Sequence, residues 1–298
     1  MRALVTTLSS RLKAADALFE QSRFGGSVAA FSDLLSRAQE KGDHPMEIVA
    51  RSMCARCLIR RHDIDGAREH LQAAGALVDP LHVQAHGRYR AALARLAVAE
   101  GFADNELRHY LEWATDMNVP LGVIDACTLL ARSTEGEIRA EWLERAIDEA
   151  ETCDVTDGIG ELCNDLGATL DLLDRRDEAA AVYVRAVGFH RAHGTPRQLA
   201  GACWAAGAAL VASDDWGGGR ELLDEAVRMA TTAVDAQDIL ALALADLARV
   251  QEASGDVIEA RRLLIRAAQI AREQGLPETW PGRWRSMVGF GRTLELTL

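Results

Sequence analysis

Few residues in this chain of 298 amino acids stand at the spacings that catalysis or metal binding requires. His82 and His86 are four positions apart, so both imidazoles would lie on one face of a helix, as in some zinc sites. No third ligand accompanies them, and His82 is not followed by the glutamate of the metalloprotease motif. We interpret both as surface or packed histidines. His190 and His193 stand at the predicted end of a helix, where cationic groups suit the helix dipole.

Two other patterns are typical of chemistry but have a structural interpretation. Cys54 and Cys57 form a C-x-x-C motif inside a predicted helix, without the second pair of a zinc site or the neighbouring parallel sheet of a redox motif. Gly217–Gly219 precedes a helix whose N terminus could accept an anion, and we interpret it as a hairpin turn. Nucleophile-elbow and phosphate-loop motifs are missing from the sequence. We predict no enzyme activity, no catalytic residue, no metal and no cofactor.

Composition limits the compartment and the partners. The formal net charge of −12 argues against nonspecific nucleic-acid binding, which needs a dense basic face. No window approaches the roughly 18 consecutive apolar residues of a membrane-spanning helix, and residues 1–10 contain no secretory apolar core. The six cysteines occupy helical positions suited to small apolar residues, which indicates buried thiols in a reducing cytosol. We therefore predict a cytoplasmic protein with no nucleic acid and no membrane as partner.

The elements that would position any site come from a repeated pattern. Small, bulky and small residues fall at i, i+4 and i+7 on one helix face, mostly at intervals of about forty residues. Alanine and leucine dominate, and strand-like alternation is nowhere sustained. The seven copies are Ser27/Phe31/Leu34, Ala67/Leu71/Ala74, Leu107/Leu111/Ala114, Arg139/Leu143/Ala146, Ala179/Tyr183/Ala186, Gly219/Leu223/Ala226 and Ala260/Leu264/Ala267.

Each copy has a partner helix before it. A small residue stands twelve positions before the first member of nearly every copy, where it allows two antiparallel helices to approach closely; Arg95 is the exception. Glycine with aspartate or serine marks the turn inside each pair, and proline begins several of the next pairs. The sequence therefore predicts fourteen helices in seven hairpins and no strands. The small residues are Ala15, Ala55, Cys127, Gly167, Gly207 and Ala248.

This pattern resembles the tetratricopeptide repeat, whose consensus combines Leu-Gly, then Ala, a bulky residue and Ala. The best match runs from Cys163 through Leu166 and Gly167 to Ala179, Tyr183 and Ala186. The spacing of about 40 exceeds the family's usual 34 and is similar to longer-helix variants in kinesin light chains and in sensor regions of bacterial regulators. The resemblance covers roughly residues 1–275 and implies an all-α, right-handed superhelical solenoid of about seven hairpins.

Two features divide the chain further. One shorter step, of about 32 residues between Leu107 and Arg139, suggests a possible division of the repeat array, residues 1–275, near residues 118–120. Residues 276–298 break the pattern and carry Trp280 and Trp284. We expect this segment to be a capping helix over the last repeat, or a docking tail that reaches another subunit. A homo-oligomer through the terminal repeats is therefore one expectation.

The resemblance also implies where a partner binds. In tetratricopeptide folds the first helix of each pair lines the concave face, and ligands usually lie there. Trp204 would be a typical aromatic anchor in this groove, or else a tryptophan packed into the neighbouring repeat. Only Asn164 corresponds to the Lys/Asn/Arg clamp of the chaperone-binding members, so that activity is not carried over. The candidate groove residues are Arg56, Arg60, Arg132, Asn164, Asp171, Trp204 and Arg249.

These features together favour a binding protein. We expect a non-catalytic scaffold or adaptor that binds a protein or peptide in the concave groove. The alternative is a regulatory sensor that binds a peptide or ligand and controls a partner through a change in superhelix shape. An attached DNA-binding or ATPase domain would normally mark that second class, and the sequence contains none.

Overall fold

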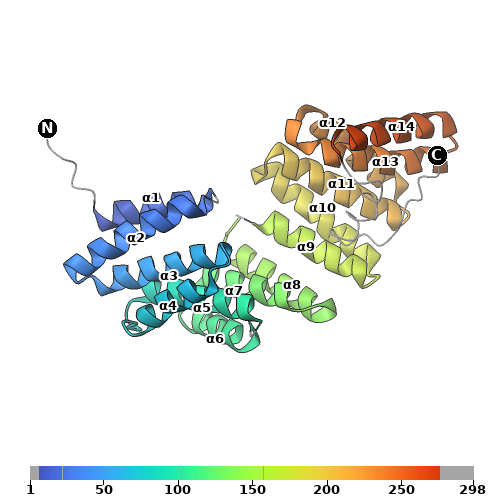
Figure 1. Ribbon diagram of the computed structural model, residues 1–298. Helices are drawn as coiled ribbons and strands as arrows, with labels where there is room; N and C mark the ends of the chain where they lie inside the picture. The colour runs from blue at the N-terminus through green and yellow to red at the C-terminus, as the bar shows by residue number, and fades with distance from the viewer. Residues whose placement is uncertain (1–6, 22, 102, 157, 276–298) are drawn as a thin grey trace. The chain divides into compact units, whose positions relative to one another are not determined.

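The computed structural model describes residues 7–21, 23–101, 103–156 and 158–275. These residues form fourteen α helices and one short 3-10 helix, with no strand among them, which confirms the all-α prediction (Figure 1). The chain divides into two compact units, Met1–Ser133 and Thr134–Leu298. The helices are α1 (Leu8–Glu20), α2 (Phe24–Lys41), α3 (His44–Arg60), α4 (Ile64–Gly75), α5 (Val83–Glu100), α6 (Ala103–Asp116), α7 (Pro120–Ser133), α8 (Gly136–Thr152), α9 (Ile159–Leu172), α10 (Arg176–His193), α11 (Pro196–Ala212), α12 (Trp216–Thr232), η1 (Val234–Ala236), α13 (Gln237–Ala253) and α14 (Val257–Glu273).

Consecutive helices pack on each other throughout both units. In unit 1 the pairs α1/α2, α3/α4 and α5/α6 are followed by α7, which packs on α5 and α6. In unit 2, α8 packs on α9, and the pairs α9/α10, α11/α12 and α13/α14 follow. The division lies between Ser133 and Thr134, and a subdivision of the repeat array near 118–120 stays a prediction. The position of the division follows from the packing of α7, which joins it to the helices before it.

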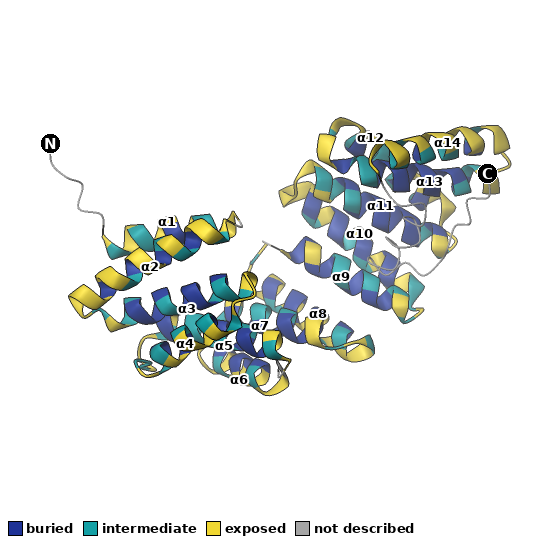
Figure 2. Ribbon diagram, viewed as in Figure 1, coloured by how far each residue is buried: buried dark blue, intermediate teal, exposed yellow. Residues whose placement is uncertain are grey.

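The repeated pattern forms the core. Every member of the seven copies is buried except Arg139 and Leu264, which are half-buried. Figure 2 shows the buried residues in dark blue along the helix surfaces that face other helices. α11 and α12 approach each other closely, since a Cβ on Gly207 would lie 2.9 Å from the Gly219 carbonyl oxygen. The small residues at this position are therefore required by helix packing, as the sequence predicts.

The helix ends follow the predicted turn chemistry. Asp43, Asp215 and Asp256 each accept a hydrogen bond from the backbone N–H three positions on, at the starts of α3, α12 and α14. These carboxylates satisfy N–H groups that have no partner inside the helix. Thr195 and Gln198 form a reciprocal capping box at the start of α11. The caps thus define the hairpins locally, before any contact between pairs.

The cysteines lie where the repeats need small residues, with one correction. Cys54 and Cys57 are fully buried, and burial raises the pKa of their thiols to about 11 and about 12. Cys153 is exposed at the C-terminal cap of α8, so its interpretation as a buried residue was wrong. The helix ends before Cys153, which removes it from the packed face.

Among the described helices, none combines the length and the apolarity needed to cross a membrane. The proposed cap or tail at 276–298 lies outside the described residues.

Candidate ligand-binding surface

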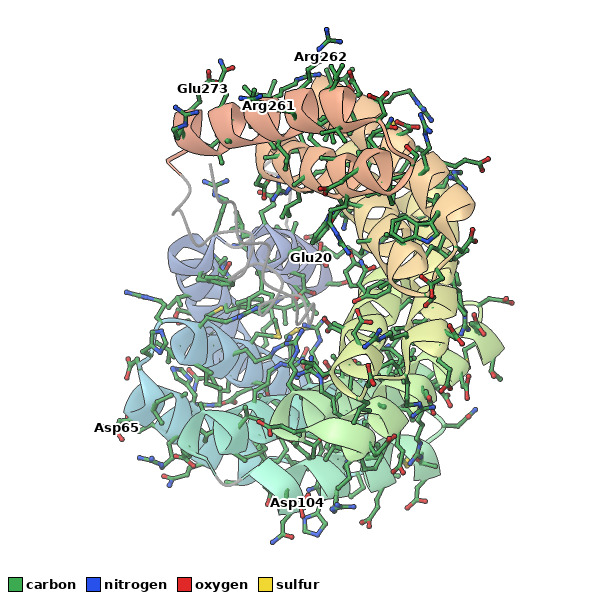
Figure 3. The ribbon with its side chains drawn as sticks, turned by 90° about the vertical axis from the view of Figure 1, so that its right-hand side faces the viewer. Glu20, Asp65, Asp104, Arg261, Arg262 and Glu273 are labelled. Atoms are coloured by element: carbon green, nitrogen blue, oxygen red, sulfur yellow. The ribbon has the colours of Figure 1, made fainter. Side chains whose placement is uncertain are left out.

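The first helices of successive pairs pack side by side within each unit. In unit 1, α3 packs on α1 and α5, and α5 packs on α7; in unit 2, α11 packs on α13. We call the surface of α1, α3, α5 and α7, and likewise that of α9, α11 and α13, the first-helix face of its unit. Figure 3 labels exposed charges on second helices, such as Asp65, Asp104 and Arg261, and also Glu20 at the end of the first helix α1. The predicted groove residues all lie on first helices: Arg56 and Arg60 on α3, Arg132 on α7, Asn164 and Asp171 on α9, Trp204 on α11 and Arg249 on α13.

Arg56 is a half-buried cation of unit 1. Its guanidinium lies 4.9 Å from the centre of the Phe19 ring, and Nη1 is 3.7 Å from Met53 Sδ. Its Nε is buried without a hydrogen-bond partner, and within the described part of the chain Arg56 forms no ion pair. Burial, followed by the nearby charge of Arg95, lowers the pKa of Arg56 to about 10. The charged form is therefore held at a cost in free energy.

Arg60 and Arg132 are more accessible. Arg60 is exposed, one helical turn beyond Arg56, and its guanidinium lies 5.6 Å from the centre of the Phe24 ring. Arg132 is exposed at the end of α7. Arg60 and Arg132, like Arg56, form no ion pair with a described carboxylate. The structure therefore places Arg56 and Arg60 together on one helix, and Arg132 two first helices further along the unit.

Two further arginines of α5 are fully paired. Arg88 donates two hydrogen bonds to Asp16, both at 2.8 Å. Arg95 donates to Asp125 at 2.9 and 2.5 Å, and the Tyr110 hydroxyl donates to the same carboxylate at 3.2 Å. Arg95 thus replaces the small residue of other repeats with a bidentate ion pair. The sequence pattern did not predict these pairs because their members lie in different repeats. The only available signal was Asp125, a carboxylate two positions before the small residue Cys127.

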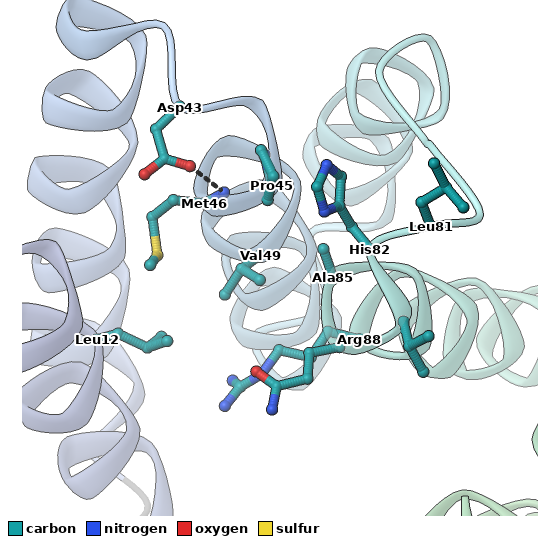
Figure 4. Close-up of a pocket in the computed structure, with 11 residues that line it drawn as sticks. Leu12, Asp43, Pro45, Met46, Val49, Leu81, His82, Ala85 and Arg88 are labelled. Atoms are coloured by element: carbon teal, nitrogen blue, oxygen red, sulfur yellow. Dashed lines mark hydrogen bonds between the residues drawn. The ribbon is translucent and has the colours of Figure 1, made fainter. Parts of the chain in front are cut away.

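A pocket of mixed lining adjoins Arg88. It has a volume of about 390 Å³, and its apolar residues are Leu12 of α1, Met46 and Val49 at the start of α3, and Ala85 of α5, beside the polar Asp43, His82, Gln84 and Arg88 (Figure 4). The backbone N–H of Met46 donates to the capping carboxylate of Asp43, as the dashed line in Figure 4 shows. The apolar lining can receive an apolar side chain of a ligand.

The two histidines beside this pocket do not form a shared site. His82 is exposed at the N-terminal cap of α5, whereas the buried ring of His86 lies 5.2 Å from the centre of the Trp113 ring. Within the described residues, no three His, Cys, Asp or Glu side chains are placed to hold one metal ion. His82 and His86 are therefore one surface residue and one packed residue.

In unit 2, Trp204 is 1% exposed. Its Nε1–H donates to Asp246 Oδ2 at 2.9 Å, and Arg249 donates to the other oxygen of the same carboxylate at 3.2 Å. Trp204 is therefore packed against the neighbouring repeat, as the second interpretation of the sequence expected, and not a free-standing aromatic of the groove. Trp204 and Arg249 meet through Asp246, which sequence analysis missed.

A cavity of about 230 Å³ opens beside Trp204 on the first-helix face of unit 2. Asn164 and His190 line it, and the Asn164 amide nitrogen lies 3.3 Å from His190 Nε2. The Asn164 Oδ1 atom is buried and has no hydrogen-bond partner. His190 is 5% exposed, and it also lines an adjacent cavity of about 160 Å³ with Glu161. The signal for His190 was its place seven residues after Tyr183, on the buried face of α10.

The Asp171 carboxyl group lies in a poorly solvated position of unit 2. It is half-buried on α9, and its Oδ2 atom is buried without a hydrogen-bond partner. Burial raises the pKa of Asp171 to about 7, against a smaller lowering by Arg176. A cation brought by a ligand would favour the carboxylate and lower this pKa.

Replacing Asp171 with asparagine is expected to stabilise the protein at pH 8 but not at pH 4. Because the pKa of Asp171 is about 7 in the folded state and 3.8 ordinarily, the folded chain keeps a proton that the unfolded chain has released between these values. The free energy of unfolding therefore falls as the pH rises through this window and is level above it. Because Asp171 is only half-buried, solvent screens part of its charge. We therefore expect Asp171→Asn to raise the free energy of unfolding by about 1–2 kcal/mol at pH 8.

Urea denaturation of both proteins at pH 4 and pH 8 measures this difference. Asp177→Asn, at an exposed position of α10, is the matched control and is expected to change stability by less than about 0.5 kcal/mol at either pH. An equal gain for Asp171→Asn at both pH values would show that its carboxyl group is not the cause.

Comparisons with known proteins identify the fold. No protein-family model and no curated protein matches the sequence. Among solved structures, the chain is similar to a signal-transduction ATPase with a tetratricopeptide repeat sensor from Pyrococcus horikoshii, with a TM-score of 0.72 and 14% identity over 94% of this chain. It spans only 42% of that protein.

Two other solved structures have a similar fold. A tetratricopeptide repeat-containing protein from Cytophaga hutchinsonii has a TM-score of 0.61 at 14% identity, covering 87% of this chain and 95% of that one. Aspartyl phosphate phosphatase F from Bacillus subtilis has a TM-score of 0.57 at 10% identity, covering 98% of this chain and 73% of that one. At these identities the likeness concerns the fold, which is a tetratricopeptide-like helical solenoid.

Proposed function

We propose that this tetratricopeptide-like solenoid is a non-catalytic scaffold or adaptor that binds a protein or peptide on its first-helix faces. The observation that carries the proposal is the Asn164 side chain. Its Oδ1 atom is buried without a hydrogen-bond partner, and the residue is one of those lining a cavity of about 230 Å³. A buried acceptor without a partner is uncommon in folded proteins because it loses its hydrogen bond to water.

A peptide fits this site chemically. An extended backbone offers N–H donors along its length, and one of them could satisfy Asn164 Oδ1. Apolar walls from Ala205 and Ile239 line the same cavity and would contact a side chain. The second candidate function is a peptide sensor that controls a partner. The protein from Pyrococcus horikoshii, whose repeats are described as a sensor, favours this class through its similar fold.

Neither function includes a catalytic step. The phosphatase from Bacillus subtilis shares the fold at 10% identity, and its activity is not transferred to this chain. Trp204 and Arg249 support the face from beneath through Asp246. Arg132 belongs to the first-helix face of unit 1, where it is exposed to a partner.

Capture of peptides by the full chain tests the proposal. The immobilised protein is exposed to a peptide library, and the bound peptides are identified by mass spectrometry. We expect a reproducible set of peptides, whose affinity falls about tenfold in Asn164→Ala. Gln269→Ala, on the exposed side of α14, is the matched amide control and is expected to bind as the unmodified chain does. Melting temperatures check that both variants are folded.

The outcomes separate the two functions. Enrichment of a folded partner protein supports the scaffold, whereas a peptide that changes the radius of gyration in X-ray scattering supports the sensor. If no peptide or protein is enriched over bare resin, or if Asn164→Ala binds as tightly as the unmodified chain, the proposal fails.

A further inference from the structure

One face of α3 changes from apolar to cationic along its length. Met46, Val49, Met53, Arg56 and Arg60 follow one another at intervals of three or four residues, so they share this face. Met46 and Val49 line the pocket beside Leu12, and Arg56 and Arg60 stand at the other end of the helix. Between the two ends Met53 is buried in the core, while the guanidinium of Arg56 lies over Phe19 of α1 and that of Arg60 over Phe24 of α2.

The cationic end carries more positive than negative charge. Arg88 and Arg95 of α5 are each held by a carboxylate through two hydrogen bonds. Asp125 is already used by Arg95 and by the Tyr110 hydroxyl. Arg56 lies near both arginines, because their charges contribute to lowering its pKa. Arg56 and Arg60 therefore remain without a carboxylate partner among the described residues, in a chain whose formal net charge is −12.

Packing alone does not require a guanidinium at position 56. A methionine would cover Phe19 with a similar stem and would not place a half-buried cation beside two others. The Nε–H of Arg56 has no acceptor, although buried donors are nearly always satisfied. The guanidinium of Arg56 lies over Phe19 and donates through Nη1 to Met53 Sδ, and the exposed guanidinium of Arg60 lies over Phe24. Neither contact supplies a carboxylate acceptor.

We infer that the first-helix face of unit 1 binds an acidic peptide, in which two carboxylates pair with Arg56 and Arg60. This inference rests on the proposed function and specifies its ligand. The two arginines are one helical turn apart, about 6 Å. Alternate side chains of an extended peptide are about 6.6 Å apart and point the same way. The arrangement therefore suits Glu or Asp at every second position, each carboxylate meeting one guanidinium fork.

The apolar part of the pocket at the start of α3 places a second requirement on such a peptide. Met46 and Arg56 are ten residues apart on α3, which corresponds to about 15 Å along the helix axis. An extended peptide covers this distance in about four to five residues. An apolar residue at that separation from the acidic pair would reach the pocket lined by Leu12 and Val49.

Fluorescence anisotropy with a labelled Glu-Ser repeat of eight residues tests the inference on the full chain. We expect saturable binding at low ionic strength, and weaker binding as salt is added. The matched Gln-Ser peptide is expected to bind at least tenfold more weakly, because it offers no charge-assisted hydrogen bond. A peptide with leucine five positions before the first glutamate is expected to bind more tightly than the plain repeat.

Variants assign the binding to the two arginines. Arg56→Met is expected to weaken binding of the Glu-Ser peptide about tenfold or more, and Arg60→Gln about threefold. Arg108→Gln, an exposed arginine of the second helix α6, is the control and is expected to stay within about twofold of the unmodified chain. Arg56→Lys keeps the charge but loses the fork, so binding is expected to fall at least threefold. It serves as the second variant if Arg56→Met is not folded.

Failure of this inference is distinguishable from failure of the proposed function. If the Glu-Ser peptide does not bind, or binds no better than the Gln-Ser peptide, the acidic ligand is wrong. Equal binding by Arg56→Met, or by Arg56→Lys where the methionine variant is unfolded, overturns it as well. Peptides captured from the library that still require Asn164 would leave the proposed function standing in that case.

Discussion

Replacing Asp246 with alanine is expected to lower the free energy of unfolding by about 3–5 kcal/mol. Asp246 is 1% exposed and accepts hydrogen bonds from Trp204 Nε1 and from Arg249. The alanine removes both acceptors, so the buried indole N–H loses this bond and the partly buried guanidinium loses its counter-charge. Few single substitutions on the first helices remove so much at once.

Urea denaturation followed by tryptophan fluorescence measures this loss, and hydrogen exchange locates it in α11 and α13. Asp224→Ala is the matched control, because Asp224 and Arg220 form an exposed ion pair that contributes less than about 0.5 kcal/mol. The double variant Asp246→Ala/Arg249→Met should recover part of the loss, since no uncompensated charge remains. A loss of less than about 1 kcal/mol would mean that the Trp204–Asp246 bond stabilises little.

Replacing Gly207 with valine is expected to destabilise the protein by about 3 kcal/mol. A Cβ at Gly207 would lie 2.9 Å from the Gly219 carbonyl oxygen and 2.8 Å from Leu223 Cγ. A Cβ at Gly219 would meet the Gly207 carbonyl oxygen at 2.8 Å, so the contact is reciprocal. Since backbone atoms cannot rotate away, α11 and α12 would have to separate.

Gly188→Val is the matched control for this substitution. Gly188 also lies within a helix, α10, but a Cβ there would meet nothing within 4 Å. We expect it to change stability by less than about 0.5 kcal/mol, since valine is at least as good a helix former as glycine. Thermal and urea denaturation of the two variants compare the same chemical change at two sites. Equal effects would contradict close helix packing at Gly207.

The fold was largely predictable because its signal is local and repeated. Each copy of the small–bulky–small pattern, such as Ala179/Tyr183/Ala186, places the corresponding face of its helix in the core. The turns were predictable for the same reason, since Asp215 or Thr195 needs only its own next three residues to cap a helix. The boundary between the units was not local, because it depends on α7 packing on α5 and α6.

The site was predictable only as a set of helices. Periodicity places Arg56, Asn164 and Trp204 on first helices, and the structure has them there. Which of them is free for a ligand depends on a residue about forty positions away in the next repeat. Trp204 is held by Asp246, and no comparable carboxylate pairs with Arg56. Equivalent positions of a repeat therefore differ in role.

The sequence by itself determined the helices, their pairing along the chain, the caps and the residues that fill the core, because these depend on neighbours within one hairpin. Only the tertiary structure decided which polar side chains neutralise each other. Arg95 with Asp125 and Trp204 with Asp246 use charges and donors that would otherwise face a ligand. Such pairs form between side chains of different repeats, whose rotamers and offsets the period does not encode. Arg56 Nε and Asn164 Oδ1 are among the buried polar atoms that have no hydrogen-bond partner after this pairing.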